Sequence, residues 1–213
     1  LGAFDVSELN LEANETDLQK YILSYLRVNE QWTYTVGAVY KHYREKGYGT
    51  WVLSRSYLNN YSYKYRNNIE VDSLLTFDYL SEEAENKFKY ENTTRTDNGY
   101  KFNIGGGLEY AQYSNATFRK DFVGTIPVTT DYDINLGLWK WSVFGQVSKE
   151  FYQKTLILSL GIRSDANNYS SSMSNLLDQV SPRFSASYKF LPDVSANFNI
   201  GRYYQLPAYT TLG

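Results

Sequence analysis

The sequence predicts an all-β protein, an antiparallel β-barrel that spans a membrane, and three observations lead to this fold class. Apolar and polar residues alternate with period two in several segments, which places them on opposite faces of a strand. The 213 residues include 22 Tyr and 4 Trp, residue types that collect at membrane interfaces. Short turns also alternate with long connections, as they do in transmembrane barrels.

The clearest alternation covers residues 138–165 and predicts a hairpin that turns near Tyr152 and Gln153. Each arm has one apolar and one polar face, with Phe144 as the exception, and about the 9–11 residues that a tilted strand needs to cross a bilayer. The residues predicted to face lipid here and in the last two strands are Trp139, Trp141, Leu156, Leu158, Leu160, Phe184, Phe198 and Ile200. The residues predicted to face the lumen are Gln146, Arg163, Asp165 and Arg183.

In chain order, residues 1–16 are polar and irregular and predict an unpaired lead-in. Residues 18–28 are apolar on both parities, so they form either a separate strand that turns at Asn29-Glu30 or the upper part of one long strand. Alternation then runs from Trp32 to Tyr40. A glycine-containing turn at 44–49 precedes a strand over 50–63.

Residues 64–82 predict a long connection. The segment after it could begin as a short helix by propensity, but we favour a strand from about Glu83, because Phe88 and Tyr90 alternate with charged residues. Asn98-Gly99 predicts a tight hairpin turn into a strand that starts at Tyr100. Three consecutive glycines at 105–107 lack a phosphate-loop pattern and indicate a bend or close packing in a barrel wall.

The remaining segments continue the alternation of short and long connections. Residues 114–134 and 166–181 predict long loops, whereas 151–154 and 191–193 predict tight turns. Strands are expected over 182–190 and 194–201. A soluble sandwich has no reason to sort its connections this way, so the pattern favours a membrane barrel.

Composition excludes several function classes. A net charge of −2 gives no basis for nucleic-acid binding, and the absence of Cys with a single His gives none for a metal centre. No catalytic constellation stands out, so we predict no enzyme activity, no cofactor and no metal. No apolar run approaches about 18 residues, and the mean hydropathy is −0.51. A barrel and a soluble all-β protein both fit the composition.

Four pieces of the sequence occur together in a familiar order: Phe144-Gly145-Gln146, Leu160-Gly161-Ile162-Arg163, Ser181-Pro182-Arg183-Phe184 and the stretch from Gly201 to Tyr209. In this spacing they resemble the barrel of TonB-dependent outer-membrane receptors of Bacteroidetes-type bacteria. The likeness is clear over about 135–210 and weaker over 30–113.

The resemblance implies a barrel of about 22 strands with an N-terminal plug in the bacterial outer membrane. It implies energised uptake of a siderophore, cobalamin, glycan or peptide. The expected partners are outer-membrane lipid, the TonB complex through an N-terminal region absent here, an unknown small ligand and a surface lipoprotein lid. Residues 1–213 have no recognisable plug, and about eight or nine strands are counted. We therefore expect a section of one larger barrel domain, with a complete small barrel as the second interpretation.

Ligand contacts in such a receptor are expected from extracellular loops and the upper lumen, where aromatic residues and Arg dominate recognition. The candidates by residue type are Tyr113, Phe118, Arg119, Lys120, Tyr132 and Tyr169. The rival function is a small outer-membrane or soluble all-β binding or adhesin module without transport.

Overall fold

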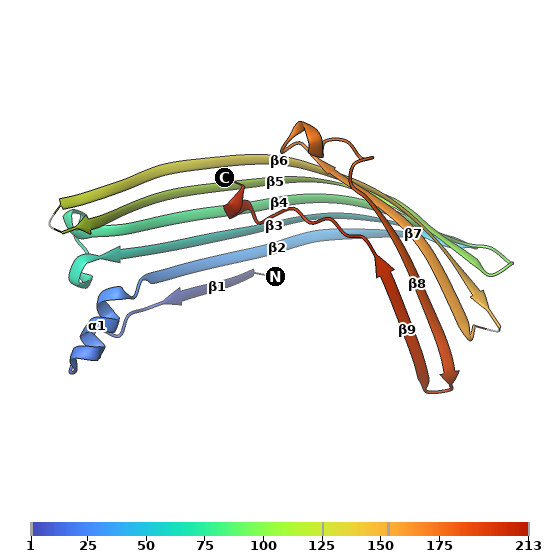
Figure 1. Ribbon diagram of the computed structural model, residues 1–213, viewed down its shortest axis with the longest axis horizontal. Coiled ribbons are helices and arrows are strands. Elements are labelled where there is room, and N and C mark those ends of the chain that lie inside the picture. Colours follow the sequence, from blue (N-terminus) through green and yellow to red (C-terminus); the bar gives the residue numbers. More distant parts are fainter. Residues whose placement is uncertain (1, 125, 153, 213) are drawn as a thin grey trace.

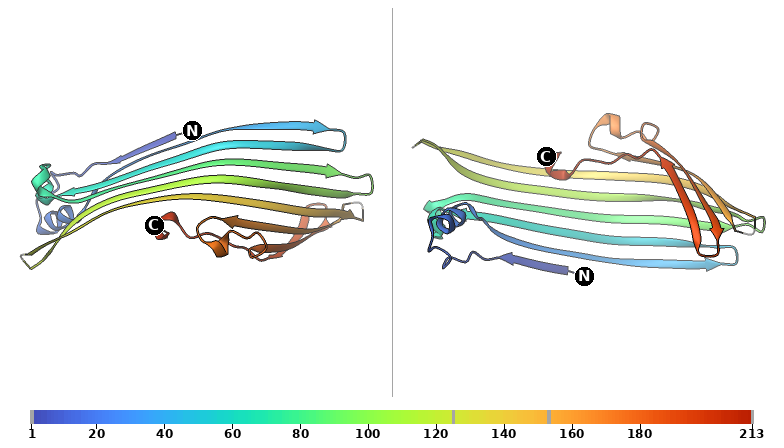
Figure 2. Two further views of the ribbon diagram at one scale, coloured as in Figure 1. Left: turned by 90° about the horizontal axis from the view of Figure 1, so that it is seen from above. Right: turned by 60° about the horizontal axis from the view of Figure 1, so that its bottom comes forward.

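The computed structural model, which describes residues 2–124, 126–152 and 154–212, is one antiparallel sheet of nine strands in sequence order (Figure 1). The predicted all-β class and the count of eight or nine strands are confirmed. The sheet is bowed, and β7 to β9 fold toward the side on which the C-terminal segment lies (Figure 2). The strands are β1 (Gly2–Ser7), β2 (Val28–Arg44), β3 (Gly47–Tyr65), β4 (Leu75–Arg95), β5 (Tyr100–Val123), β6 (Ile126–Phe151), β7 (Leu156–Asn167), β8 (Val180–Leu191) and β9 (Val194–Gly201).

Two predicted long connections are wrong, because the strands extend beyond the segments in which apolar and polar residues alternate. Residues 114–134 are the upper halves of β5 and β6, which pair continuously up to Val123 and Ile126. The 64–82 connection shrinks to 66–74, which holds two short 3-10 turns, η1 (Arg66–Asn68) and η2 (Asp72–Leu74). Backbone pairing with a long neighbour extends a strand through polar sequence that has no strand pattern of its own. Of the three predicted long connections, the one between β7 and β8 stays long, at 168–179, and contains η3 (Ser171–Met173).

The N-terminal predictions also need correction. Part of the expected irregular lead-in is β1, which pairs with residues 29–34 of β2. Residues 18–28 form neither a separate strand nor the upper part of a long one. Most of them belong to the helix α1 (Asp17–Tyr25). Thr16 and Gln19 form a reciprocal capping box, in which the Gln19 amide donates to Thr16 Oγ1 at 3.2 Å and the Thr16 amide donates to Gln19 Oε1 at 2.8 Å. This capping signal was present in the sequence and outweighs the apolar pattern.

The preferred strand after the first connection is confirmed in type, although it begins at Leu75 instead of about Glu83. The tight turns at 44–49, 96–99 and 191–193 are also confirmed. At the hairpin of 138–165, Tyr152 and Lys154 adopt positive φ angles of 50° and 74°, and Gln153 lies outside the described residues. None of the helices in the described part of the chain is long and apolar enough to cross a membrane.

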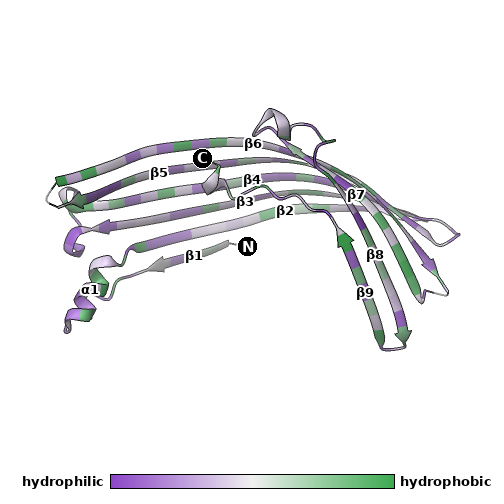
Figure 3. Ribbon diagram, in the orientation of Figure 1, coloured by the Kyte–Doolittle hydropathy of each residue, from purple (hydrophilic) through white to green (hydrophobic). Residues whose placement is uncertain are grey.

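One face of the sheet, here the outer face, carries an exposed apolar band near the tight-turn ends of the strands. The strand register sets Ala38, Leu53, Phe88, Leu108 and Trp141 side by side in one row across this face. Figure 3 shows the alternation of apolar and hydrophilic positions along the strands. The exposed fraction is 62% for Leu53, a value typical of a side chain with no protein neighbour above it.

The apolar band covers only part of each long strand. On the outer face of β5 the unbroken run of apolar residues ends at Tyr110, and Gln112 and Ser114 follow. With 24 residues, β5 is roughly 80 Å long, far more than the ~30 Å of a hydrocarbon core. The polar halves of β2 to β6 therefore extend well past the band, on the side of α1 and the β5–β6 tip.

Candidate functional site

The opposite, inner face of the sheet carries a network of four charged side chains. The register places Lys87 of β4 opposite Glu109 of β5, and Glu109 opposite Lys140 of β6, with Glu85 one alternate position along β4. Lys87 Nζ lies 2.5 Å from Glu85 Oε2 and 3.6 Å from Glu109 Oε2, and Lys140 Nζ contacts both Glu109 and Glu85. Two cations therefore neutralise two carboxylates, which are 20–23% exposed.

After β9 the chain leaves the sheet and crosses this inner face. We call residues 202–212, which end in the 3-10 turn η4 (Tyr209–Thr211), the strap (Figure 1). The Tyr209 hydroxyl donates to Glu85 Oε1 at 2.5 Å and accepts from Lys140 Nζ at 2.6 Å. The Tyr209 ring stacks on Tyr113 with centroids 6.4 Å apart. One phenol thus joins the strap directly to the charge network.

Further contacts hold the strap at its two ends. The Arg202 amide donates to the Pro182 carbonyl at 3.1 Å, and the Tyr169 hydroxyl donates to the Leu212 carbonyl at 3.1 Å. Ala111 and Leu138, on the inner face near the network, are each only 1% exposed. Polar contacts at Arg202, Tyr209 and Leu212 therefore hold the strap in place.

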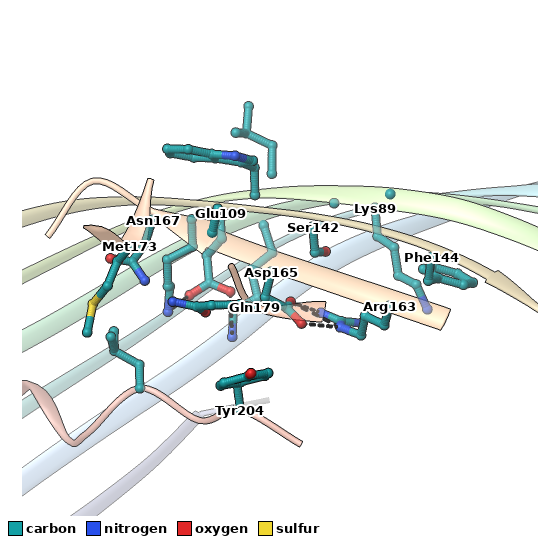
Figure 4. A pocket seen from close by; sticks show the side chains of 18 of the residues that line it. Lys89, Glu109, Ser142, Phe144, Arg163, Asp165, Asn167, Met173, Gln179 and Tyr204 are labelled. Carbon is teal, nitrogen blue, oxygen red and sulfur yellow. Dashed lines mark hydrogen bonds and ion pairs between the residues drawn. The ribbon is translucent and has the colours of Figure 1, made fainter. Parts of the chain in front are cut away.

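A cavity of about 530 Å³ lies between the strap and the inner face (Figure 4). Its walls come from β4 to β7 and its cover from Tyr204, Gln205, Leu206 and Pro207 of the strap. Arg163 and Asp165, which point into the cavity, form a bidentate pair with nitrogen–oxygen distances of 2.6–3.0 Å. Cations, carboxylates and aromatic rings together suit a polar ligand that carries charge.

A second cavity of about 270 Å³ continues from the first along the inner face. Lys89, Phe144 and Arg163 line both cavities. Phe144, the apolar exception on the polar face, lies over Gly105, where an added Cβ would stand 2.7 Å from the Phe144 ring. Glycine at 105 therefore provides the space for an aromatic ring at the junction of the two cavities.

The register places all four residues predicted for the lumen, Gln146, Arg163, Asp165 and Arg183, on the inner face. Each lines at least one of the two cavities. The eight residues predicted to face lipid lie on the outer face by the same register. Contact of those eight residues with lipid stays a prediction.

The six predicted ligand contacts are not brought together. Tyr113 is 4% exposed beneath Tyr209, so the docked strap covers it. Arg119 pairs with Asp121 on the upper part of β5, while Phe118 and Lys120 point to the opposite face of that strand. Tyr132 is on β6, and Tyr169 contacts the strap.

The family comparison agrees with this arrangement of an apolar outer face and a polar inner face. The sequence profile described as "TonB dependent receptor-like, beta-barrel" matches residues 5–213, nearly the whole chain. The chain belongs to the TonB-dependent receptor β-barrel family. No curated protein matches the sequence.

As a TonB-dependent receptor barrel domain, the sheet belongs to a family of outer-membrane receptors and transporters. The sequence pattern around Phe88 and Tyr90 indicates a charged strand face, but it carries no signal for the inner-face network of this receptor wall, because the partners Glu109 and Lys140 come from other strands. Tyr209 was part of a recognised motif, but its contact with β4, 124 residues away, has no local signal.

The Tyr209 hydroxyl predicts alkaline release of the strap. Burial, followed by the hydrogen bond to Glu85, raises the pKa of Tyr209 well above its usual value near 10. The docked state binds this proton more tightly than the released state, so docking is strongest below about pH 10 and weakens above it. A spin label at Ala208→Cys is expected to gain mobility in that range.

The control for the alkaline release is Tyr209→Phe, which removes the titrating group but keeps the ring. Docking in this variant is expected to be weaker at neutral pH and to lose the pH dependence above about 10. The same alkaline gain in mobility in Tyr209→Phe would assign the release to a group other than Tyr209.

Proposed function

We propose that this chain forms part of the wall of a receptor that takes up a scarce nutrient across the bacterial outer membrane. The observation that carries the proposal is the charged inner-face cavity, enclosed by the strap, on a sheet with an exposed apolar outer face. The family match supports an outer-membrane receptor. The four motifs from Phe144 to Tyr209 support the Bacteroidetes type.

The wall residues bind and orient the ligand and perform no covalent chemistry. Lys87, Lys89 and Arg163 offer cationic donors, and Glu109 and Asp165 offer acceptors, so a ligand with charged and hydrogen-bonding groups fits. Siderophores, cobalamin, glycans and peptides all present such groups. Energy would come from TonB through an N-terminal region, and a surface lipoprotein lid is a further proposed partner.

The two cavities suggest a track for the ligand along the wall. They share Lys89, Phe144 and Arg163, so a ligand can exchange contacts step by step between them. The strap covers the larger cavity with Tyr204 to Pro207. Strap release would widen the space beside the inner face, which makes strap docking a point at which transport is controlled.

The test is nutrient uptake by cells that lack the native receptor and carry the full-length protein. Labelled siderophores, cobalamin, oligosaccharides and peptides are supplied in turn, with and without a protonophore. Uptake of one class that stops when the proton gradient is abolished is the expected result. Arg163→Gln should lower that uptake roughly 10-fold or more, because hydrogen bonds to a charged group contribute about 1.5–3 kcal/mol.

The matched control is Lys149→Gln, which removes a cation from the outer face, where Lys149 lies 4.0 Å from the Tyr100 ring centroid. This variant should take up the nutrient normally. Uptake that continues without the gradient, or no uptake of any class by correctly inserted receptor, contradicts the proposed function.

A further inference from the structure

Arg55 occupies a special position on the outer face, at the border of the apolar band. The row that contains Leu53, on the side of the tight turns, is apolar throughout. Arg55 stands in the next row, between Val36 of β2 and Asn86 of β4. That row continues to Tyr110 and Trp139, whose rings pack with centroids 4.7 Å apart. Aromatic rings with one cation at the end of an apolar band mark the level of lipid headgroups.

Two neighbouring strands hold the Arg55 side chain in place. Its Nε donates to the Tyr34 hydroxyl at 2.9 Å, and its Nη1 donates to Asn86 Oδ1 at 2.8 Å. Both acceptors are neutral, and within the described residues Arg55 forms no ion pair with a carboxylate. The guanidinium has five N–H donors, so a preorganised cation with further donors is left at the surface.

The nearest acidic side chain on this face, Glu82, has other partners. It lies two rows farther from the band, where it accepts hydrogen bonds from the Tyr57 hydroxyl and from Ser114 Oγ. Arg55 and Glu82 therefore line the same cavity without an ion pair between them among the described residues. An anion that approaches from the side of the apolar band meets Arg55 before it meets Glu82.

A cavity of about 360 Å³ adjoins Arg55 and contains hydroxyl and amide groups as well as aromatic rings. Its lining includes Arg55, Glu82, Tyr57, Tyr110, Gln112 and Ser114. Glu82 offers an acceptor for sugar hydroxyls, whereas Arg55 offers the cation. The lining residue Tyr57 packs with Trp32 and Tyr34, and the three ring centroids are 4.8–5.9 Å apart. Aromatic faces beside hydrogen-bonding groups suit a sugar ring, whereas Arg55 suits a phosphate attached to it.

We propose that Arg55 and the adjoining cavity bind the phosphorylated sugar headgroup of an outer-leaflet glycolipid. The phosphate lies on the Arg55 guanidinium, the sugar lies against Tyr110 and Gln112, and the acyl chains run along Val36 and Leu53, which are 61% and 62% exposed. The apolar surface directly below the cation is what favours a lipid over a soluble phosphate. The inference rests on the proposed placement in the outer membrane.

The test uses the full-length receptor in nanodiscs and native mass spectrometry to count bound lipid. The probes are a diphosphorylated glucosamine disaccharide lipid, the same lipid without phosphates, and inorganic phosphate as competitor. Wild-type receptor is expected to retain the phosphorylated lipid selectively. Arg55→Gln should weaken retention roughly 10- to 100-fold, and Arg55→Lys, which keeps the charge but loses the planar fork, should give an intermediate loss.

Lys149→Gln, which removes the outer-face cation at the opposite border of the band, is the matched control and should retain lipid like the wild type. Equal retention in Arg55→Gln and wild type, or equal retention of the dephosphorylated lipid, overturns the site. Displacement by millimolar inorganic phosphate assigns Arg55 to free phosphate and overturns the lipid proposal. Nutrient uptake by the same receptor is scored separately, so a wild-type receptor that takes up nutrient but shows no lipid selectivity refutes this site and leaves the proposed function standing.

Discussion

Leu160→Arg is expected to lower the free energy of unfolding of the membrane-inserted receptor by about 2–4 kcal/mol. Leu160 lies on the outer face of β7 in a row with Val147 and Phe184, and its side chain is 60% exposed. Its row is two residues farther into the band than that of Leu158, which sits beside Lys149. A guanidinium at Leu160 would therefore lie deep in hydrocarbon, where a charge is most costly.

The matched control is the neighbouring Ser159→Arg, because adjacent residues of one strand point to opposite faces. Ser159 lies on the inner face, where its hydroxyl donates to Ser148 Oγ at 2.7 Å. Arginine there reaches water in the lumen and loses one hydrogen bond, at a cost of about 1 kcal/mol. The measurement is a denaturant titration of receptor folded into lipid vesicles. Equal destabilisation by the two variants would contradict the assignment of the outer face to lipid.

Lys140→Met is expected to release the strap and to weaken the wall beneath it. Lys140 is 25% exposed and contacts Glu109, Glu85 and the Tyr209 hydroxyl at once. Methionine keeps the length of the side chain but leaves two partly buried carboxylates with Lys87 as their remaining cation. Loss of a charged hydrogen bond costs about 1.5–3 kcal/mol, which shifts the docking equilibrium roughly 10- to 100-fold toward the released strap.

Hydrogen exchange of the peptide amides in 202–212 measures this release. The Arg202 amide donates to the Pro182 carbonyl of the wall, and the Leu212 amide donates to the Tyr209 carbonyl within η4, the turn whose Tyr209 side chain contacts the network. Lys89→Met is the matched control. Lys89 forms one ion pair with Glu91 on the same face and is 50% exposed, so its loss should cost at most about 1 kcal/mol. Exchange in the strap that is equally slow in Lys140→Met and wild type would show that the network does not hold it.

The apolar and polar faces of the strands followed directly from the sequence. Apolar and polar residues alternate with a period of two around Trp139, Leu160 and Phe198. Because successive side chains of a strand point to opposite faces, the apolar residues lie on one face and the polar residues on the other. The turn at Asn98-Gly99 was equally local, because its backbone angles depend on residues within the turn itself.

The lengths of β5 and β6 and the state of residues 17–25 did not follow from the pattern. Residues 114–134 lack alternation, and they are extended because each strand supplies the hydrogen-bond partners of the other. The apolar residues of α1 fit more than one period and do not predict a helix, whereas the cap at Thr16 is specific to a helix.

Spacing along the chain is enough to show which residues share a face and which family the barrel resembles. The network of Glu85, Lys87, Glu109, Lys140 and Tyr209, with a strap across it, becomes visible only in the folded arrangement. Those five side chains come from three strands and a distant turn. Their contacts depend on the register between strands and on the path of the chain after β9. No local stretch of sequence specifies either of these.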